Sequence, residues 1–247
     1  MRRLAILVIA LAATGCAHYT TPGGAVSLAG IDDADIAEAF ERRPAASFPA
    51  NIATVRIQER GYPNAAAKDL GAFSVVSVRD LETDEAAARI AKLDKVRGVA
   101  PLSTLLMPPT AAAIGDLRPS AAQLQADLLL VYTVDTLFTI DGSDVGPLSV
   151  ISLGMLRDRS ASVTATVAGI LIDVRTGFIY GAIEASATEE QRASAWTSSA
   201  KTDAARIRAE KAAFAAYVGE FEGFWPDLLV AHARPYPPGR RYYVEDR

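Results

Sequence analysis

The chain has 247 residues, of which 50% are hydrophobic, and its 25 Lys and Arg against 29 Asp and Glu give a net charge of −4. This length and composition suffice for one large domain or two small ones with a sizeable core. Because both signs of charge are spread along the chain, no basic stripe could neutralise successive phosphates, which argues against a nucleic-acid partner.

The N-terminal residues have the pattern of an export signal. Arg2 and Arg3 form a positive region, residues 4–11 form an apolar run, and residues 13–16, Ala-Thr-Gly-Cys, place small side chains at a cleavage point. The pattern resembles a bacterial lipoprotein signal, although an Ala stands at position 13 where Leu is usual. An apolar run this short favours a signal over a transmembrane helix, which needs roughly 20 residues. The alternative is an ordinary cleaved signal peptide.

Cys16 is the single cysteine of the chain. We expect residues 1–15 to be removed and Cys16 to carry a lipid such as palmitate, followed by a tether over 16–30 that is rich in Thr, Pro and Gly. Ala17 follows the anchor where an Asp would favour the inner membrane, so the outer membrane is preferred. The absence of a second thiol excludes disulfides, thiolate metal sites and cysteine nucleophiles in the mature chain.

The α/β domain is expected over 31–230. Its first half is predicted to contain, in chain order, a helix around 36–40 that ends at Pro44, a half-buried strand over 52–58, a strand over 73–78, an amphipathic helix over 82–93, a short strand over 96–101 and a helical turn over 102–106. In the helix over 82–93, Glu85 and Arg89 have the spacing of an ion pair.

The second half has stronger patterns. They predict a helix introduced by Pro119, a central strand over 127–138, a turn over 141–144, a hairpin of 163–174 with 178–187, and a long helix from Ser198 to Trp225. Gly177 supplies a positive φ at the hairpin turn. The apolar segment 148–155 has no assignable partner, and the Pro-rich residues 231–247 form an extended tail.

The long helix is expected to lie across the sheet. Ile207, Phe214, Val218, Phe221 and Trp225 recur at helical spacing and predict the face that packs on the strands. The charged residues of this helix lie mostly on its other faces; they are Arg206, Arg208, Glu210 and Lys211. The fold class is therefore α/β, with a single mixed sheet, flanking helices and the long C-terminal helix packed on that sheet.

Residues that could perform chemistry are few. The histidines, His18 and His232, lie near the ends of the domain, where rigid positioning of a general base is not expected. No Gly-x-Ser-x-Gly elbow or glycine-rich phosphate loop is present. Asp141, Ser143 and Asp144 lack the remaining ligands of an EF-hand and are typical of a turn. We therefore expect no catalytic residue, no metal and no cofactor.

Aromatic side chains are the candidates for partner contact. Trp196 lies in a polar segment and is interpreted either as a packing residue at a helix start or as an exposed contact. Tyr62, in the Gly-Tyr-Pro turn after the strand over 52–58, is a second candidate contact. The helical spacing of Trp225 favours burial in the core.

Two short motifs resemble a known family. The helix followed by Ala126-Asp127 and the apolar strand resembles an element of the curli-secretion lipoproteins. Residues 173–177, Asp-Val-Arg-Thr-Gly, resemble a hairpin of that family and of the related outer-membrane lipoproteins that activate penicillin-binding proteins. The likeness spans roughly residues 52–187. It implies an α/β domain used for assembly and contact rather than catalysis, and it carries over no functional residue apart from Cys16.

The leading hypothesis is a membrane-anchored periplasmic lipoprotein that binds a protein partner or supports an envelope assembly, and that is not an enzyme. One alternative is an envelope hydrolase that uses an acidic pair, Asp135 with Asp141 or Asp173, since two carboxylates in different environments can divide acid and base roles. Another is a ring-forming secretion component. The sequence leaves the oligomeric state and the identity of the partner open.

Overall fold

The structure is a computed structural model that describes residues 36–62, 64, 67–77, 81–140, 143–144, 160–192 and 199–232. The predicted signal peptide and Cys16 lie outside the described residues, as do Asp141, the segment 148–155, Trp196 and residues 233–247 of the expected tail.

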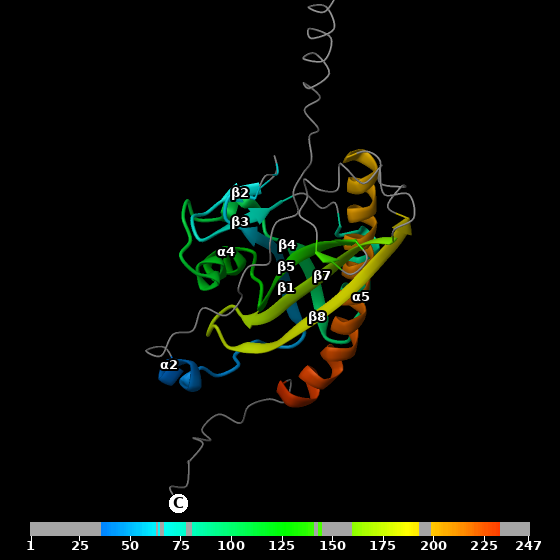
Figure 1. Cartoon of the computed structure of the whole chain (residues 1–247). Coiled ribbons are helices and arrows are strands. Elements are labelled where there is room, and N and C mark those ends of the chain that lie inside the picture. Colours follow the sequence, from blue (N-terminus) through cyan, green and yellow to red (C-terminus); the bar gives the residue numbers. More distant parts are fainter. Residues whose placement is uncertain are drawn as a thin grey trace, which may run out of the picture.

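Within the described residues, eight strands form one sheet in the order β2-β3-β1-β5-β7-β8, with β4 paired to β1 and β6 paired to β5 (Figure 1). The strands are β1 (Ala50–Glu59), β2 (Ala67–Asp69), β3 (Phe73–Val76), β4 (Val96–Pro101), β5 (Leu128–Ile140), β6 (Ser143–Asp144), β7 (Ser160–Asp173) and β8 (Ile179–Arg192). The helices are α2 (Ile36–Glu41), α3 (Asp84–Ala91), α4 (Arg118–Gln123) and α5 (Ser199–His232), with 3-10 turns η1 (Thr104–Leu106) and η2 (Ile114–Leu117).

The sheet is mixed, because β1 runs parallel to β4 and β5, whereas the pairs β1–β3, β5–β7 and β7–β8 are antiparallel. Two hydrophobic clusters lie on its opposite faces. One gathers α3, α5 and the inward side chains of β5 and β7, and the other gathers the η1–α4 region and the alternate side chains of the same strands. The predicted fold class, including the long helix packed on the sheet, is confirmed.

Strand β1 is more deeply buried than its alternating pattern indicated. Arg56 and Gln58, expected on a solvent face, are 4% and 3% exposed. The reason is that β1 is a central strand with β5 on one edge and β4 and β3 on the other, and each face is covered by helices. The Gln58 amide bonds to the backbone N–H and C=O of Val134, so a side chain continues the pairing where β1 and β5 part.

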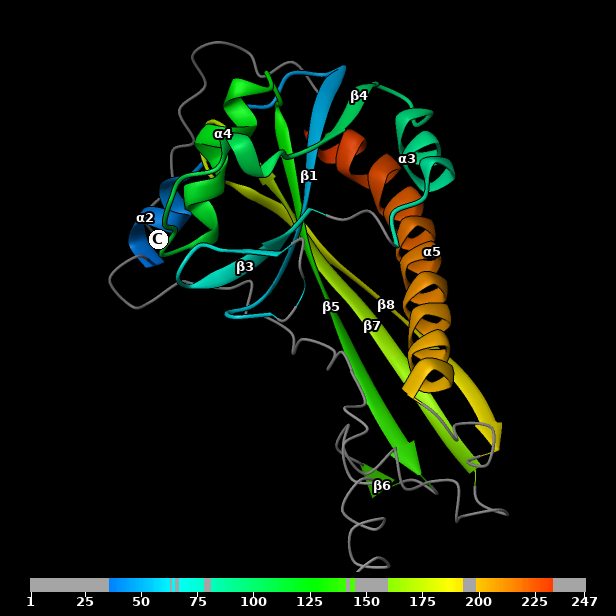
Figure 2. The same ribbon diagram turned by 90° about the horizontal axis from the view of Figure 1, so that it is seen from above.

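Strands β5, β7 and β8 run on beyond the rest of the sheet as a three-stranded ribbon, with α5 along one side (Figure 2). The close approach of α5 requires Gly169 on β7. A Cβ at that position would lie 2.9 Å from both Tyr132 Cβ and the Val131 carbonyl oxygen, and inside contact distance of the Tyr217 hydroxyl.

Helix α5 continues through Pro226 to His232, whereas the sequence predicted an end at Trp225. A proline inside a helix costs about 3 kcal/mol. Trp225 and Leu228 on either side of it are 1% and 3% exposed, and full burial of such side chains contributes about 1.5–3 kcal/mol each. Pro226 itself is exposed, so its missing N–H lies on the solvent side and packing decides the conformation.

Two electrostatic expectations about the helices are corrected. Arg206 and Glu210 were expected on outer faces, but they are buried and paired, with Arg206 Nη1 2.8 Å from both carboxylate oxygens and the Thr136 hydroxyl donating to Glu210. On α3, Arg89 does not pair with Glu85; it donates to both oxygens of Glu222 on α5, at 2.8 and 2.6 Å. The Arg206–Glu210 pair has local i,i+4 spacing, and its burial arises because this part of α5 packs on β5 at Thr136. For Arg89, a tertiary neighbour outcompetes the local partner.

Candidate functional site

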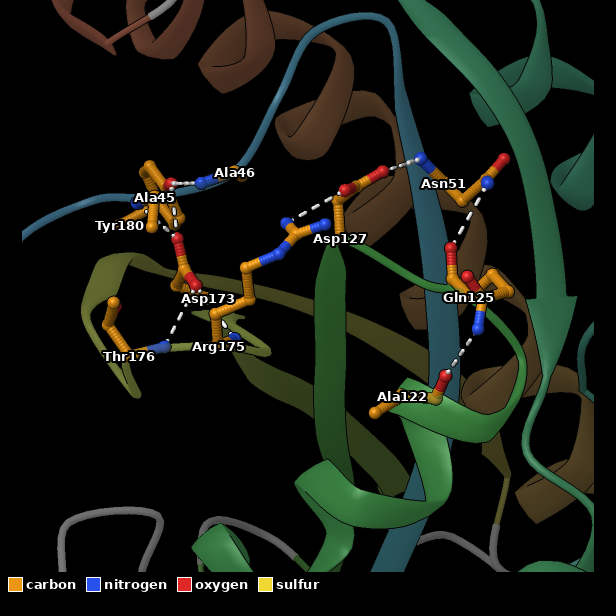
Figure 3. Close-up of polar contacts among 10 residues, drawn as sticks. All are labelled: Ala45, Ala46, Asn51, Ala122, Gln125, Asp127, Asp173, Arg175, Thr176 and Tyr180. Carbon is orange, nitrogen blue, oxygen red and sulfur yellow. Dashed lines mark hydrogen bonds and ion pairs between the residues drawn. The ribbon is translucent and has the colours of Figure 1, made fainter. Parts of the chain in front are cut away.

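The two motifs behind the family resemblance meet at one end of the sheet. Leu128, which follows Asp127, pairs with Asp173, and the Val174 N–H donates to the Asp127 carbonyl oxygen. Figure 3 shows Asp127, Asp173 and Arg175 converging there from β5 and the β7–β8 turn. The predicted hairpin is confirmed, and Gly177 has the expected positive φ, 76°.

Asp173 is fully buried, and its carboxylate is saturated with donors. Oδ1 accepts from the backbone N–H groups of Arg175 and Thr176, while Oδ2 accepts from the Ala45 N–H at 2.6 Å and the Tyr180 hydroxyl at 3.0 Å. Burial raises the pKa of Tyr180, and the charge of Asp173 adds to that rise. The hydrogen bonds of Asp173 therefore link the segment that precedes β1 to the hairpin turn.

Asp127, which precedes β5, likewise links β1 to the hairpin turn. Its Oδ2 accepts from the Asn51 N–H at 3.0 Å, and its Oδ1 lies 2.9 Å from Nη1 of Arg175. Asn51 in turn donates to the Gln125 carbonyl oxygen. Since each carboxylate oxygen of Asp127 and Asp173 has a partner, the two side chains form a structural junction between β1, β5 and the hairpin turn.

The acidic pair of the hydrolase alternative is not assembled between Asp135 and Asp173. In the β5–β7 ladder Asp173 pairs with Leu128 and Asp135 pairs with Thr166, seven residues further along. At about 3.3 Å per residue the two carboxylates lie roughly 23 Å apart along the sheet. Asp141, the other candidate, lies outside the described residues.

The remaining candidates from the sequence are placed as follows. Tyr62 is half-buried in the turn after β1, and its backbone bonds to Glu59 and Asn64. His232, expected at a loose end, is the last residue of α5, with its ring 5.2 Å from that of Tyr180 and 5.7 Å from that of Phe178. Burial lowers the pKa of His232. No group of three or more His, Cys, Asp or Glu in the described parts of the chain could hold a metal ion.

A pocket of about 190 Å³ lies on the sheet face that also carries α3 and α5. Its floor is formed by side chains of neighbouring strands, among them Thr54 and Arg56 of β1, Val99 of β4, and Leu130 and Tyr132 of β5. Ile90 of α3 and Phe214 and Tyr217 of α5 form its walls. The sequence pattern does not reveal this site, because an Arg in an alternating strand normally marks a solvent face.

The pocket contains a buried charged group. Nη1 of Arg56 lies 3.7 Å from Oε1 of Glu82, and the Tyr132 hydroxyl donates to the same carboxylate oxygen. Burial raises the pKa of Tyr132 well above its ordinary value, and the negative charge of Glu82 raises it further. Tyr132 therefore stays neutral and acts as a hydrogen-bond donor.

A second feature is the outer face of the ribbon, which we define as the side chains that point away from α5. They are Asp135, Leu137, Thr139, Ser162, Thr164, Thr166, Ala168, Glu184, Ser186, Thr188 and Glu190. Hydroxyl pairs link the strands across this face, with Thr164 2.9 Å from Thr188 and Thr166 2.7 Å from Ser186. In the rows from Ala168 to Ser162 this face holds three acids and no Lys or Arg, and the next row pairs Ser160 with Arg192. No described element covers it.

Comparisons with known proteins leave the family open. No family model and no curated protein matches the chain. Among solved structures, it is similar to the hypothetical protein CT253 of Chlamydia trachomatis, at 13% identity over 71% of this chain and 96% of that one, with a TM-score of 0.33. It is also similar to a PelC dodecamer from Paraburkholderia phytofirmans, at 14% identity over 69% and 91% of the two chains, with a TM-score of 0.31.

A further neighbour is a putative lipoprotein of Caulobacter crescentus CB15, at 13% identity over 51% of this chain and 88% of that one, with a TM-score of 0.26. At such TM-scores the likenesses carry no argument about what this chain does. The resemblance to the curli-secretion and penicillin-binding-protein-activator lipoproteins is not confirmed and stays a prediction.

Proposed function

We propose that this chain is an exported lipoprotein, anchored in the outer membrane through Cys16, which faces the periplasm and binds a protein partner as part of an envelope assembly. The signal pattern over residues 2–16 supports the anchor, and Ala17 supports the outer membrane. None of the helices in the described ranges is long and apolar enough to cross a membrane.

The observation that carries the binding role is the outer face of the ribbon. Strands of 13 and 14 residues extend beyond the core, and their outer side chains are exposed or half-buried over several ladder rows. A solvent-facing sheet surface is ordinary, but in the rows from Ala168 to Ser162 the acids Asp135, Glu184 and Glu190 have no basic residue among them. Such a surface suits a partner that presents positive charge and hydrogen-bond donors.

The anchor and the ribbon would work together. A lipid at Cys16 confines the domain to the membrane surface, and the flexible tether predicted over 16–30 lets the domain reach partners close to its anchor. Confinement raises the effective concentration of the partner, so a modest interface suffices for stable engagement. In this proposal the domain recognises and holds its partner, and it performs no catalysis.

The proposal is tested by site-specific photo-crosslinking in the native envelope. A crosslinker at Thr166, on the outer face of the ribbon, should capture one reproducible protein, whereas one at exposed Ala216 on α5 should not. The yield should fall at high salt, since charge complementarity is screened. Equal capture from both positions, or capture of lipid alone, would overturn the binding role.

The anchor has its own test. Cys16→Ser should release the chain from the membrane fraction into the soluble periplasmic fraction, while the thermal unfolding midpoint of the domain stays the same. Full retention of the variant in the outer-membrane fraction would overturn the lipid anchor, whatever the crosslinking shows.

A further inference from the structure

The outer edge of β8 has no described strand beside it. Strand β8 pairs with β7 and ends the strand order, so it forms the margin of the ribbon (Figure 1). It is 14 residues long, and its ladder with β7 runs without a register shift from Gly181 to Arg192. A long edge of this kind presents a row of backbone N–H and C=O groups that can pair with another chain.

The sequence of β8 lacks the side chains that usually prevent such pairing. Natural edge strands are commonly short, or carry Lys or Pro, or are twisted away by bulges. Residues 179–191 contain no Lys, Arg or Pro, and residues 185–188 are Ala-Ser-Ala-Thr, whose small side chains permit a close approach. The composition of β8 is therefore typical of a strand that pairs on both edges.

Helix α5 leaves this edge free near the far end of the ribbon. Glu210 of α5 accepts a hydrogen bond from Thr136 of β5, and Arg208 of α5 lies 3.6 Å from Glu189 of β8. Since the helix reaches the strands on both sides of β7, it passes over β7 here rather than over the margin. Ala187, which points to the helix side of β8, is accordingly only half-buried.

The charges of β8 favour one occupant, a second copy of β8 in the antiparallel direction. When a two-fold axis passes through Thr188, Glu184 of each copy stands opposite Arg192 of the other, so two rows carry opposite charges. An axis one residue earlier, at Ala187, places Glu184 opposite Glu190 instead. Opposite charges that face each other across a strand pair are stabilising, whereas like charges are destabilising.

The same register continues the hydroxyl pairs of the outer face. Thr164 and Thr188 lie 2.9 Å apart, and Thr166 and Ser186 lie 2.7 Å apart. With the axis at Thr188, the two copies of this threonine stand opposite each other, and Ser186 stands opposite Glu190. Each of these rows joins polar side chains that can form hydrogen bonds.

We propose that two copies of this chain associate through antiparallel β8 strands about a two-fold axis at Thr188, which joins two three-stranded ribbons into one sheet. The contact is the same surface on both copies, as a two-fold axis requires. This inference goes beyond the proposed function, because it concerns the edge of the ribbon and a second copy, whereas the proposed function concerns the outer face and a different protein.

Disulfide trapping of the full chain in intact cells tests the contact. Residues directly opposite in an antiparallel pair have Cα atoms about 4.5–5.5 Å apart, which a disulfide can span. Thr188→Cys should be trapped as a dimer in more than half of the chains. Ala182→Cys is the matched control, because it is exposed on the same face of β8, but its two copies lie about 40 Å apart in this register.

The control should give less than a tenth of the dimer obtained with Thr188→Cys. Both variants keep Cys16, so a disulfide that involves this residue would appear equally in the two. Equal yields from the two positions, or no dimer with Thr188→Cys, would overturn the inference.

Charge exchange tests the register. In the Thr188→Cys chain, Glu184→Arg places like charges in both rows with Arg192, and Arg192→Glu does the same with Glu184. Each change should lower the trapped yield at least fivefold. When the two variants are expressed together with tags of different size, both rows of a mixed dimer again carry opposite charges. Mixed dimers should therefore recover at least half of the original yield, and mixed dimers as rare as those of either variant alone contradict the register.

Discussion

Tyr217 carries a buried hydroxyl without a hydrogen-bond partner among the described residues, and this predicts an unusual effect of its substitution. The side chain is 1% exposed, and its hydroxyl is held against the backbone of β7 at Gly169. A buried polar group without a partner costs about 1–3 kcal/mol. Tyr217→Phe should therefore raise the free energy of unfolding by about 1 kcal/mol, which raises the midpoint by about 2–4 °C in a domain of this size.

A matched control is available in the same aromatic cluster. The ring of Tyr132 lies 6.1 Å from that of Tyr217, but its hydroxyl donates to Glu82. Hydrogen bonds to charged groups contribute about 1.5–3 kcal/mol, so Tyr132→Phe should lower the free energy of unfolding by that amount. The same chemical change thus has opposite signs at the two positions.

Equilibrium urea unfolding followed by circular dichroism measures both variants. A Tyr217→Phe variant that loses about 1 kcal/mol or more would refute the reasoning, because the hydroxyl would then make a stabilising interaction. Gly169→Ala provides an independent check. It should cost about 1–3 kcal/mol by overpacking, and the loss should be smaller in a Tyr217→Phe background, where one of the three close contacts is absent.

Three further predictions concern charged groups. Asp173→Ala leaves three backbone N–H groups and a tyrosine hydroxyl without their acceptor. Thermal denaturation should therefore show that the free energy of unfolding falls by about 3 kcal/mol or more. A fall of less than about 1 kcal/mol contradicts the structural role of Asp173. Glu210→Leu removes one of the two carboxylate partners of buried Arg206, which keeps its hydrogen bonds to Asp203. Chemical denaturation should therefore show a loss of about 1.5–3 kcal/mol, which Arg206→Met in the same chain should partly restore. The hydrogen bonds of Arg89 lower the pKa of Glu222, so its contribution is present above the unfolded pKa of about 4.3 and is lost as the pH falls through the folded value. Because the pair is more than a third exposed on the Arg89 side, Glu222→Gln should cost less than about 1 kcal/mol at pH 7. In acid titrations of stability, the difference from the unsubstituted chain should shrink as the pH falls below the unfolded pKa.

The elements of the domain could be predicted from local patterns because those patterns reflect short-range physics. The hairpin of β7 and β8 follows from β-branched runs and a Gly at the turn, and α3 follows from the spacing of Ala86 and Ile90. The end of α5 was the main local failure. A proline is a reliable stop only where no packing energy opposes it, and the burial of Trp225 opposes it here.

The candidate site could not be predicted in the same way. Arg56, Glu82 and Tyr132 are separated by 26 and 50 residues in the chain, and each has an ordinary local interpretation. They come together because β5 inserts beside β1 and α3 returns over the same face. A short-range pattern contains no information about which strands become neighbours.

By itself the sequence determined the fold class, an α/β domain, and a turn chemistry that specifies the hairpin, and it predicted an export signal that ends at the single thiol. Only the tertiary structure decided which polar side chains are buried, which carboxylates link separate segments by hydrogen bonds, and where the pocket lies. The physical reason is that periodicity depends on neighbours within one turn or one strand, whereas burial, pairing and cavities depend on contacts between segments that are distant in the chain.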